Sequence, residues 1–327
     1  MKAIVIEHAG GPEVLQVGDW PRPEARPGWV LIHVKAFGLN RSELLTRLGQ
    51  SPSVTFPRIL GIECVGTVEE APGTSLQPGQ TVAAVMGGMG REFDGGYAEY
   101  TLVPAEHVLS ITTSLSWEVF GAIPETFLTA AGSLDALEIR RGQTLLVRGG
   151  TSSVGMAAIA LAKHQGLTVL ATTRSQHKVA KLRDSGADQV LIDTGKIADE
   201  VRRVLPGGAN AVLELIGVKT LPDSLQATAP KGMVCLIGGL GNVWEFEHFS
   251  PMGTIPPTVK LTVSYGSGAT NVKDRTAILQ KIVDDIEAGR YQANVDRVFH
   301  FAEIAEAHRY MEENRACGKI VVLVDEP

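Results

Sequence analysis

The residues best suited to chemistry in this sequence form one short segment, 149–155, which reads Gly-Gly-Thr-Ser-Ser-Val-Gly. A largely apolar run at 143–148 precedes this segment, and small apolar residues at helical spacing follow it as far as residue 163. The order strand, tight turn, helix places the pyrophosphate of a dinucleotide at the N-terminus of the helix. The segment therefore predicts a dinucleotide-binding turn.

Each glycine of this turn is expected to have a steric role. Gly149 and Gly150 let the chain turn sharply and let its backbone approach a phosphate, and Gly155 lets the helix lie close to the strand. Ser152 stands where the usual fingerprint has its middle glycine. A serine in this place can still offer its backbone N–H and its hydroxyl to a phosphate.

The end of the next predicted strand indicates which dinucleotide fits. Sheets that bind NAD usually carry an Asp or Glu there, which holds the ribose 2′-hydroxyl. This chain instead has Thr172, Thr173 and Arg174, with Lys178 one helical turn later. Because no acid is present and two cations are within reach, a 2′-phosphate fits better than a hydroxyl, and the sequence favours NADPH over NADH. The alternative is that Arg174 and Lys178 only begin a solvated helix.

The elements that must position the turn alternate between strands and helices. This alternation predicts right-handed βαβ units and a doubly wound parallel sheet, an α/β fold of the Rossmann type. Strands are expected at 168–173, 189–193, 211–216, 233–237 and 259–264, with helices at 177–184, 197–205 and 221–228.

The N-terminal part of the chain has a different character, because short strands are separated by Pro/Gly turns. Residues 117–137 are expected to form a helix in two pieces, broken near Pro124. After an amphipathic helix at 274–288, the final elements are predicted to return to the N-terminal domain. The resulting division is a mostly β domain of residues 1–117 and 290–327, and a dinucleotide-binding domain of residues 118–289.

Composition limits the class of protein. The chain has 327 residues, is 44% hydrophobic and carries a net charge of -6, which argues against nucleic acid as a partner. It contains no apolar run of 18 residues and begins with a predicted strand rather than a signal peptide, so no membrane association is expected. Its three cysteines are far apart in the sequence, which suits a reducing cytoplasm.

Several local motifs occur in an order that resembles the medium-chain dehydrogenase/reductase family along the whole chain. They are Gly-Leu-Asn at 38–40, Gly-x-Glu-x-x-Gly at 61–66, Pro-Gly-x-x-Val at 78–82, Gly-Gly-Tyr-Ala-Glu-Tyr at 95–100 and the turn at 149–155. The resemblance implies that the mostly β domain is a GroES-like catalytic domain.

Zinc-dependent relatives carry a histidine ligand where this chain has Ile62, and a cysteine ligand where it has residues 40–42, Asn-Arg-Ser. An aliphatic side chain cannot bind a metal, so catalytic zinc is excluded. Glu63 keeps its place without metal partners and is interpreted as a structural acid. The zinc-free pattern resembles the quinone oxidoreductase branch, whose members pass hydride from NADPH to a quinone or a conjugated enone.

The resemblance also implies roles for single residues. It places Asn40 beside the nicotinamide and the acceptor oxygen, Thr129 at the nicotinamide amide, and residues 152–154, Ser-Ser-Val, at the pyrophosphate. Lys178 and Arg315 match the cations that bind the 2′-phosphate. Alternatives stay open: Asn40 is equally suited to cap a helix that begins at Arg41, and Thr129 to be an ordinary helix residue.

At other positions the residue type differs from that of the relatives, or two roles are possible. Arg41 and Arg47 either face the cleft or lie on the solvated surface of their helix, which is the more common place for a charged helix residue. Tyrosines of the substrate pocket are replaced by Leu45 and Ser51, and a tyrosine beside the phosphate by Asp193, an acid that would weaken phosphate binding if it pointed inward.

Because fewer aromatic rings are left to stack on a flat quinone, an enone or alkene reductase is an alternative to a quinone reductase. A non-catalytic NADPH-binding protein is a second alternative. The strand at 259–264 is expected at an exposed sheet edge, and such edges are paired or covered. A homodimer joined through this strand is therefore predicted.

Overall fold

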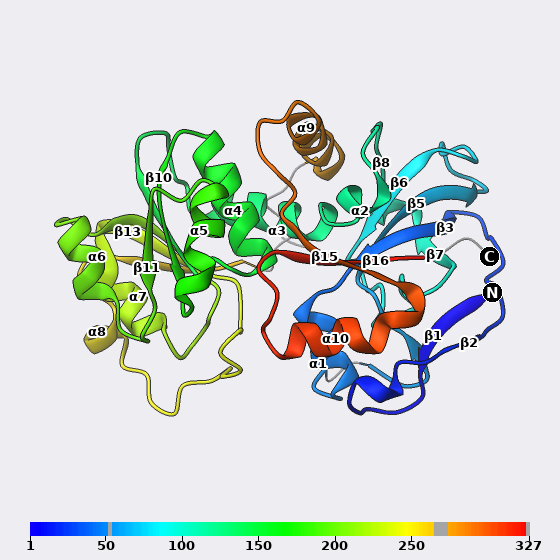
Figure 1. Ribbon diagram of the computed structural model, residues 1–327, viewed down its shortest axis with the longest axis horizontal. Coiled ribbons are helices and arrows are strands. Elements are labelled where there is room, and N and C mark those ends of the chain that lie inside the picture. Colours follow the sequence, from blue (N-terminus) through cyan, green and yellow to red (C-terminus); the bar gives the residue numbers. More distant parts are fainter. Residues whose placement is uncertain (52–53, 265–273, 325–327) are drawn as a thin grey trace. The chain divides into compact units, whose positions relative to one another are not determined.

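The computed structural model describes residues 1–51, 54–264 and 274–324. The chain divides into two compact units, each described here by itself (Figure 1). The first contains Met1–Thr126, Asp274–Gly289 and Val295–Pro327, and the second contains Phe127–Lys273 and Arg290–Asn294. Residues 118–126 and 274–289 thus belong to the first unit, whereas the sequence boundaries assigned them to the dinucleotide-binding domain.

The second unit is built on a sheet of six parallel strands in the order β11-β10-β9-β12-β13-β14. In chain order this is 3-2-1-4-5-6, the doubly wound arrangement, so the predicted fold class is confirmed. The strand order reverses between β9 and β12, and ligands of such sheets bind at the carboxyl ends of the strands beside this point. The strands are β9 (Thr144–Arg148), β10 (Thr168–Thr173), β11 (Gln189–Ile192), β12 (Ala209–Glu214), β13 (Thr228–Leu236) and β14 (Lys260–Val263).

Helices pack against this sheet because its inner strands β9, β10 and β12 are mostly buried and apolar. Helix α4 (Ser153–His164) packs against β9 and β10, α5 (Val179–Asp184) against β11, and α7 (Leu221–Ala227) against β12 and β13. The remaining helices are α3 (Pro124–Ala136), which starts in the first unit, α6 (Ala198–Val204) and the short α8 (Pro251–Thr254). One core cluster joins strands to helices through Leu146, Leu170, Val201, Val212, Leu225 and Val234.

The first unit is mostly β, as predicted. Its larger sheet has the order β15-β16-β3-β5-β6-β8, with β7 also paired to β3, and β1 lies between β2 and β4 in a smaller sheet. The strands are β1 (Lys2–Ile6), β2 (Val17–Asp19), β3 (Trp29–Gly38), β4 (Arg58–Ile59), β5 (Glu63–Glu70), β6 (Thr81–Val85), β7 (Tyr100–Pro104), β8 (Val108–Ser110), β15 (Val295–His300) and β16 (Lys319–Leu323). Because β16 pairs antiparallel with β3, the end of the chain is an integral part of this sheet.

Short helices connect the strands of the first unit. Helix α1 (Arg41–Arg47) follows β3, α2 (Trp117–Phe120) follows β8, and α10 (Ile304–Glu312) lies between β15 and β16. The break predicted near Pro124 is present, since α2 and α3 are separate helices.

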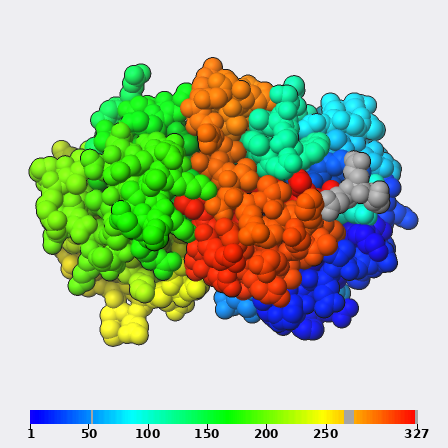
Figure 2. Space-filling view, viewed as in Figure 1, coloured from blue at the N-terminus to red at the C-terminus, as the bar shows by residue number. Residues whose placement is uncertain are grey.

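Helix α9 (Arg275–Glu287) belongs to the first unit because of specific polar contacts. Gln280 bonds both backbone groups of Thr112, at 2.8 Å each, and the Glu287 carboxylate accepts hydrogen bonds from Thr113 and Ser114. Figure 2 shows the orange residues of α9 beside the teal residues that follow β8. These contacts involve surface side chains far apart in sequence, which explains why the sequence pattern assigned the helix to the other domain.

Along the described ranges, none of the helices combines the length and the apolar character needed to cross a membrane.

Candidate functional site

The glycine-rich turn lies between β9 and α4 in the second unit and has the predicted geometry. Gly149 adopts a φ of +88°, a conformation that favours glycine. A Cβ atom on Gly155 would stand 2.6 Å from the carbonyl oxygen of Gly149 and 2.9 Å from the Cα of Gly150. No side chain fits there, so the predicted steric role of Gly155, close approach of helix and strand, is confirmed.

Ser152 holds this turn together from inside. Its backbone N–H donates to the carbonyl of Gly149 at 3.1 Å, and its hydroxyl donates to the same carbonyl at 2.9 Å. The hydroxyl oxygen also accepts from the N–H of Gly155 at 3.1 Å, as the N-cap of α4. The backbone N–H and the hydroxyl of Ser152 are thus both used in hydrogen bonds within the turn.

The next two backbone amides at the start of α4, those of Ser153 and Val154, have no acceptor among the described residues. Amides in the first turn of a helix point along its axis and favour an anion. The glycine turn and these two donors fit the pyrophosphate of a dinucleotide, and the predicted contacts of Ser152, Ser153 and Val154 remain predictions.

The residues predicted to select NADPH lie at the end of β10. Thr173 is buried, and its hydroxyl bonds the backbone of Ser175 in a local turn. Arg174 is exposed, and Lys178 is half-buried in the short 3-10 helix Gln176–Lys178. Arg315 belongs to the first unit, where its guanidinium pairs with Glu313. The structure describes Arg315 and the two cations near β10 in separate units, so their joint action on one phosphate remains a prediction.

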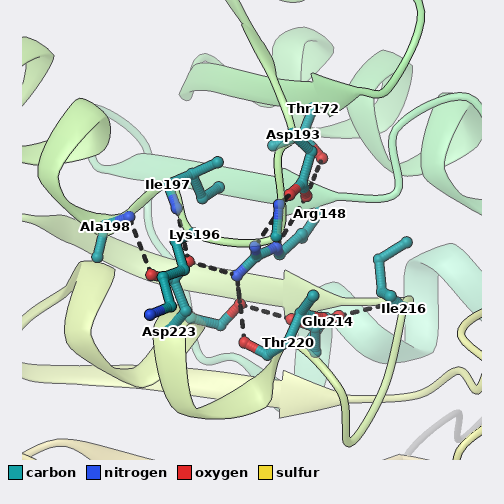
Figure 3. Close-up of polar contacts among 12 residues, drawn as sticks. Arg148, Thr172, Asp193, Lys196, Ile197, Ala198, Glu214, Ile216, Thr220 and Asp223 are labelled. Carbon is teal, nitrogen blue, oxygen red and sulfur yellow. Dashed lines mark hydrogen bonds and ion pairs between the residues drawn. The ribbon is translucent and has the colours of Figure 1, made fainter.

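A buried charged network surrounds Arg148, the residue that directly precedes the glycine turn (Figure 3). Its centre is Arg148, the last residue of β9, whose side chain is fully buried. The guanidinium forms a bidentate pair with Asp193 at 2.9 and 3.1 Å and a third bond with Asp223 at 2.7 Å. It also donates to the Thr220 carbonyl and to the Ser224 hydroxyl, both at 3.1 Å. Sequence reasoning missed this network.

The network resolves the question that the sequence raised about Asp193. Burial by itself would raise the pKa of Asp193, but hydrogen bonds from Arg148 and its positive charge outweigh burial and lower that pKa. The carboxylate is ionised, but its charge is directed at Arg148, the residue before the turn. The expected weakening of phosphate binding by an inward-pointing acid is therefore offset by the buried cation.

Hydrogen bonds connect this network to the backbone of the turn. The N–H of Gly149 donates to the Thr172 hydroxyl at 3.0 Å, and that hydroxyl donates to Asp193 at 3.3 Å. On the other side of Arg148, the Glu214 carboxylate accepts from Ser224 at 2.5 Å and from the N–H of Ile216 at 2.8 Å. The carboxyl ends of β9, β10 and β12 are thereby held together at the point where a dinucleotide is expected.

A second polar cluster lies in the first unit around Asn40. The Lys319 ammonium group donates to the Asn40 side-chain oxygen at 2.6 Å and pairs with Glu63 at 2.7 Å. The Asn40 amide nitrogen donates to Glu63 at 3.0 Å and to Glu43 at 3.2 Å. The other Glu63 oxygen accepts from the N–H of Glu125 at 2.9 Å. Glu63 thus has the structural role expected of it, whereas Lys319 was not singled out in the sequence.

These contacts decide between the two interpretations of the Asn40 side chain. Asn40 occupies the N-cap position of α1, yet its side chain makes no capping hydrogen bond. It is held instead by Lys319, Glu43 and Glu63. The expectation of a side-chain cap is therefore wrong, and the role beside the nicotinamide remains a prediction.

Glu43 has an unusual environment within this cluster. Its side chain is 1% exposed, one oxygen accepts from the N–H of Ile62 at 3.1 Å, and the other has no hydrogen-bond partner. Burial raises the pKa of Glu43 to about 7. Glu43 therefore exchanges a proton near neutral pH, whereas an exposed glutamate would be ionised.

Arg47 is fully buried, so the expected surface position is wrong. Its guanidinium pairs with Glu312 and contacts Nδ1 of His308 at 3.2 Å. Burial lowers the pKa of His308 to about 3, so the ring is neutral and accepts from Arg47 while Nε2 contacts the Tyr97 hydroxyl at 3.1 Å. Arg41, by contrast, bonds the side chain of Asn314 at the surface.

Thr129 lies in α3 and is 7% exposed, and its carbonyl accepts a hydrogen bond from Ser133 at 2.7 Å. This position is compatible with an ordinary helix residue and with a contact to the nicotinamide, so both interpretations of Thr129 remain open.

The residues at the positions of the zinc ligands do not fit a metal. Ile62 is aliphatic, and Ser42 accepts a hydrogen bond from Arg91 at 2.5 Å. The neighbouring Cys64 is buried in β5, and burial raises the pKa of its thiol. Within the residues that the structure describes, no group of three or more His, Cys, Asp or Glu side chains is arranged to hold a metal ion.

Comparison with known proteins supports this description of the two units. The family model "Alcohol dehydrogenase GroES-like domain" matches residues 26–113, and "Zinc-binding dehydrogenase" matches residues 185–322. The chain is 26% identical to a quinone oxidoreductase of Pseudomonas aeruginosa, over 98% of this chain and 99% of that protein. It is also 26% identical to a 2-haloacrylate reductase of a Burkholderia species, over 98% of each.

Solved structures show the same fold. A NAD-dependent alcohol dehydrogenase is 30% identical with a TM-score of 0.86, covering 99% of this chain and 100% of that chain. A mycobacterial protein solved in complex with NADPH is 28% identical with a TM-score of 0.86 and the same coverage.

Proposed function

Because the chain belongs to the medium-chain dehydrogenase/reductase family, we propose that it is an NADPH-dependent oxidoreductase that transfers hydride to a quinone or a related activated carbonyl compound without zinc. The observation that carries this proposal is the turn at the carboxyl end of β9. It combines close-packed glycines with the open amides of Ser153 and Val154, at the reversal point of a doubly wound sheet.

The choice of NADPH over NADH rests on charge at the end of β10. The residues there are Thr173 and Arg174, with Lys178 a turn later, and no acid competes for the ribose. Two cations favour a 2′-phosphate, and Asp193 does not oppose it because Arg148 neutralises its carboxylate. Structures with the same fold include one named NAD-dependent and one solved with NADPH. The fold alone therefore does not decide between NADH and NADPH, and the proposed preference rests on Arg174 and Lys178.

The chemical class of the acceptor is inferred from the residues at the zinc-ligand positions, Ile62 and residues 40–42, which cannot bind a metal. When bound, NADPH supplies a hydride, and without a Lewis acid the acceptor must already be electron-poor. The names of the quinone oxidoreductase and the 2-haloacrylate reductase agree with acceptors of this kind. In this proposal Asn40 and Thr129 orient the nicotinamide and the acceptor, and the bonds from Lys319 and Glu63 keep the Asn40 amide in one orientation.

A second candidate is an NADPH-dependent enone or alkene reductase. It is favoured by Leu45 and Ser51, which replace pocket tyrosines and leave less aromatic surface for a quinone. A protein that binds NADPH without turnover is the alternative outside catalysis. The three free and buried cysteines are compatible with a cytoplasmic location, which we also propose.

We further propose that the protein is a homodimer joined through β14. This strand is the last in the sheet order of the second unit, and Val263 on it is 54% exposed. Among the described residues β14 pairs on one side only, with β13, and an edge strand with an exposed apolar residue is suited to pair with the same edge of a second copy.

The proposed reaction is tested by following the loss of NADPH absorbance with a panel of acceptors. We expect turnover with a benzoquinone or a conjugated enone and none above background with an unactivated aliphatic ketone. Turnover of the enone alone would favour the second candidate. Binding of NADPH without turnover of any acceptor would favour the non-catalytic alternative and contradict the proposal.

A further inference from the structure

The first unit contains a small cavity beside the Asn40 cluster that no step above has used. Its volume is about 120 Å³, and it is lined by Ile62, Met86, Gly88, Met89, Arg91 and Glu92. The loop that forms most of this wall contains residues in the left-handed region, Met86 at a φ of 62° and Gly88 at 90°. A liquid water molecule occupies about 30 Å³, so the cavity is suited to a group of a few heavy atoms.

Arg91 gives this cavity a specific chemistry. One terminal nitrogen of its guanidinium donates to the Ser42 hydroxyl at 2.5 Å, while its Nε is buried and has no hydrogen-bond partner. Among the described residues, no carboxylate forms an ion pair with Arg91. A guanidinium that lines a cavity without a carboxylate partner is suited to bind an anionic group of a ligand. A carboxylate matches the planar fork of a guanidinium better than a neutral group does.

The other walls restrict the size and polarity of the ligand. Ile62 and Met89 are buried and apolar, and Met86 is half-buried, so the surface beside the guanidinium suits a short hydrocarbon chain. Glu92 lines the same cavity but is exposed, so water and salt screen its charge more than that of the partly buried Arg91. Its repulsion weakens an anionic ligand without excluding it.

The cavity is connected to the residues placed in the proposed reaction. Ile62 in its wall donates its N–H to the same Glu43 oxygen that accepts from the Asn40 amide. Ser42, the partner of Arg91, follows Asn40 by two positions on the first turn of α1. A group anchored at Arg91 therefore has the rest of its carbon chain close to Asn40.

The geometry points to a carboxylate subsite: Arg91 binds the carboxylate of a short 2-enoate, and the apolar wall formed by Ile62, Met86 and Met89 receives its hydrocarbon chain. This inference rests on the proposed function, because the double bond is the hydride acceptor. Hydride adds to the β-carbon, the electron pair of the C=C bond moves to the α-carbon, and the α-carbon takes a proton from solvent. The C=C bond becomes a single bond as NADPH is oxidised to NADP⁺.

The test separates binding from turnover. Butanoate, a saturated carboxylate that cannot be reduced, is titrated calorimetrically into the wild-type protein and three variants. Arg91→Met removes the guanidinium, and Glu92→Gln removes the opposing charge. Arg26→Met removes an exposed arginine of the same unit, which lies over the Trp29 ring and does not line the cavity, and is the matched control.

We expect butanoate affinity to fall at least about tenfold in Arg91→Met, to rise about threefold in Glu92→Gln, and to be unaltered in Arg26→Met. Equal binding by wild type and Arg91→Met overturns the subsite, as does a loss of affinity in Glu92→Gln. The Glu92→Gln result decides the matter even if Arg91→Met fails to fold. Equal effects of Arg91→Met and Arg26→Met indicate general charge attraction and also overturn it.

Kinetics then connect the subsite to the reaction. With NADPH, the ratio of kcat/KM for 2-butenoate to kcat/KM for 3-buten-2-one is expected to fall at least about tenfold in Arg91→Met, since only the first acceptor carries a carboxylate. An unchanged ratio overturns the inference. If no acceptor is turned over but butanoate binding depends on Arg91, the proposed reaction fails while the subsite stands.

Discussion

Replacing Arg148 with Met tests the buried network around this residue. Met retains much of the apolar stem but removes a guanidinium that is fully buried and bonded to Asp193, Asp223, Thr220 and Ser224. Breaking a buried ion pair by removing one partner costs about 3–5 kcal/mol, because the other charge stays buried and unpaired. For a unit of this size, such a loss lowers Tm by about 10 °C.

The assay is scanning calorimetry with and without NADPH. The second unit contains the glycine turn, so its transition is expected to shift upward with NADPH. Arg203→Met, which removes an exposed arginine from α6 of the same unit, is the matched control and is expected to alter stability by less than about 0.5 kcal/mol. Compared with Arg148→Met alone, the double variant Arg148→Met with Asp193→Asn should regain about 1–3 kcal/mol of unfolding free energy, since it removes a carboxylate left without its partner.

The pH dependence gives a second readout of the same network. Since Arg148 lowers the pKa of Asp193, the pair contributes its full stability above the ordinary value of 3.8 and loses it as pH falls through the lower pKa of the folded state. In Arg148→Met only the hydrogen bonds from Thr172 and from the N–H of Gly195 still oppose the effect of burial on this pKa, so stability is already reduced at neutral pH. A loss below about 1 kcal/mol, together with additive effects of the two substitutions, would refute the reasoning.

Three further predictions concern the cofactor, the acidic cluster and the sheet edge. Lys178→Ala should weaken NADPH binding at least about tenfold more than NADH binding in fluorescence titrations, and equal effects on both would exclude a contact with the 2′-phosphate. Because burial raises the pKa of Glu43 to about 7, the folded state keeps a proton that the unfolded chain releases near 4.5. Wild-type stability should fall by about 3 kcal/mol between these pH values, and urea unfolding of Glu43→Gln should lack this decline; a decline shared by both proteins would contradict the assignment. Val263→Lys should convert the dimer to a monomer in light scattering at micromolar concentration, and a monomeric wild type would rule out the dimer.

The parts of the fold that were predicted from sequence depend on local patterns. Alternating apolar runs and turns placed the six parallel strands, and the glycine spacing placed the turn, because Gly155 has no room for a Cβ. The mostly β domain followed from its Pro/Gly turns in the same way. The assignment of α9 failed because side-chain contacts with residues 112–114 decide it, and its apolar periodicity carries no information on that partner.

The parts of the site that escaped prediction depend on contacts distant in sequence. Arg148 was included in the largely apolar run 143–148 without a role of its own, because only the folded sheet brings Asp193 and Asp223 to its guanidinium. Lys319 directly precedes an apolar run, and a lysine in such a position needs an acidic partner if it is buried. The sequence does not show that this partner is Glu63. Arg47 was mistaken for a surface residue because the helix pattern did not reveal the contact with Glu312 and His308.

The most direct test of the account compares NADPH with NADH as the hydride donor, with a benzoquinone as acceptor and a strong chelator present. The account predicts that kcat/KM is at least about tenfold higher for NADPH, owing to charge-assisted contacts with the 2′-phosphate, and that the chelator has no effect. Equal values for the two donors, or rates with either donor no greater than in buffer, would contradict it.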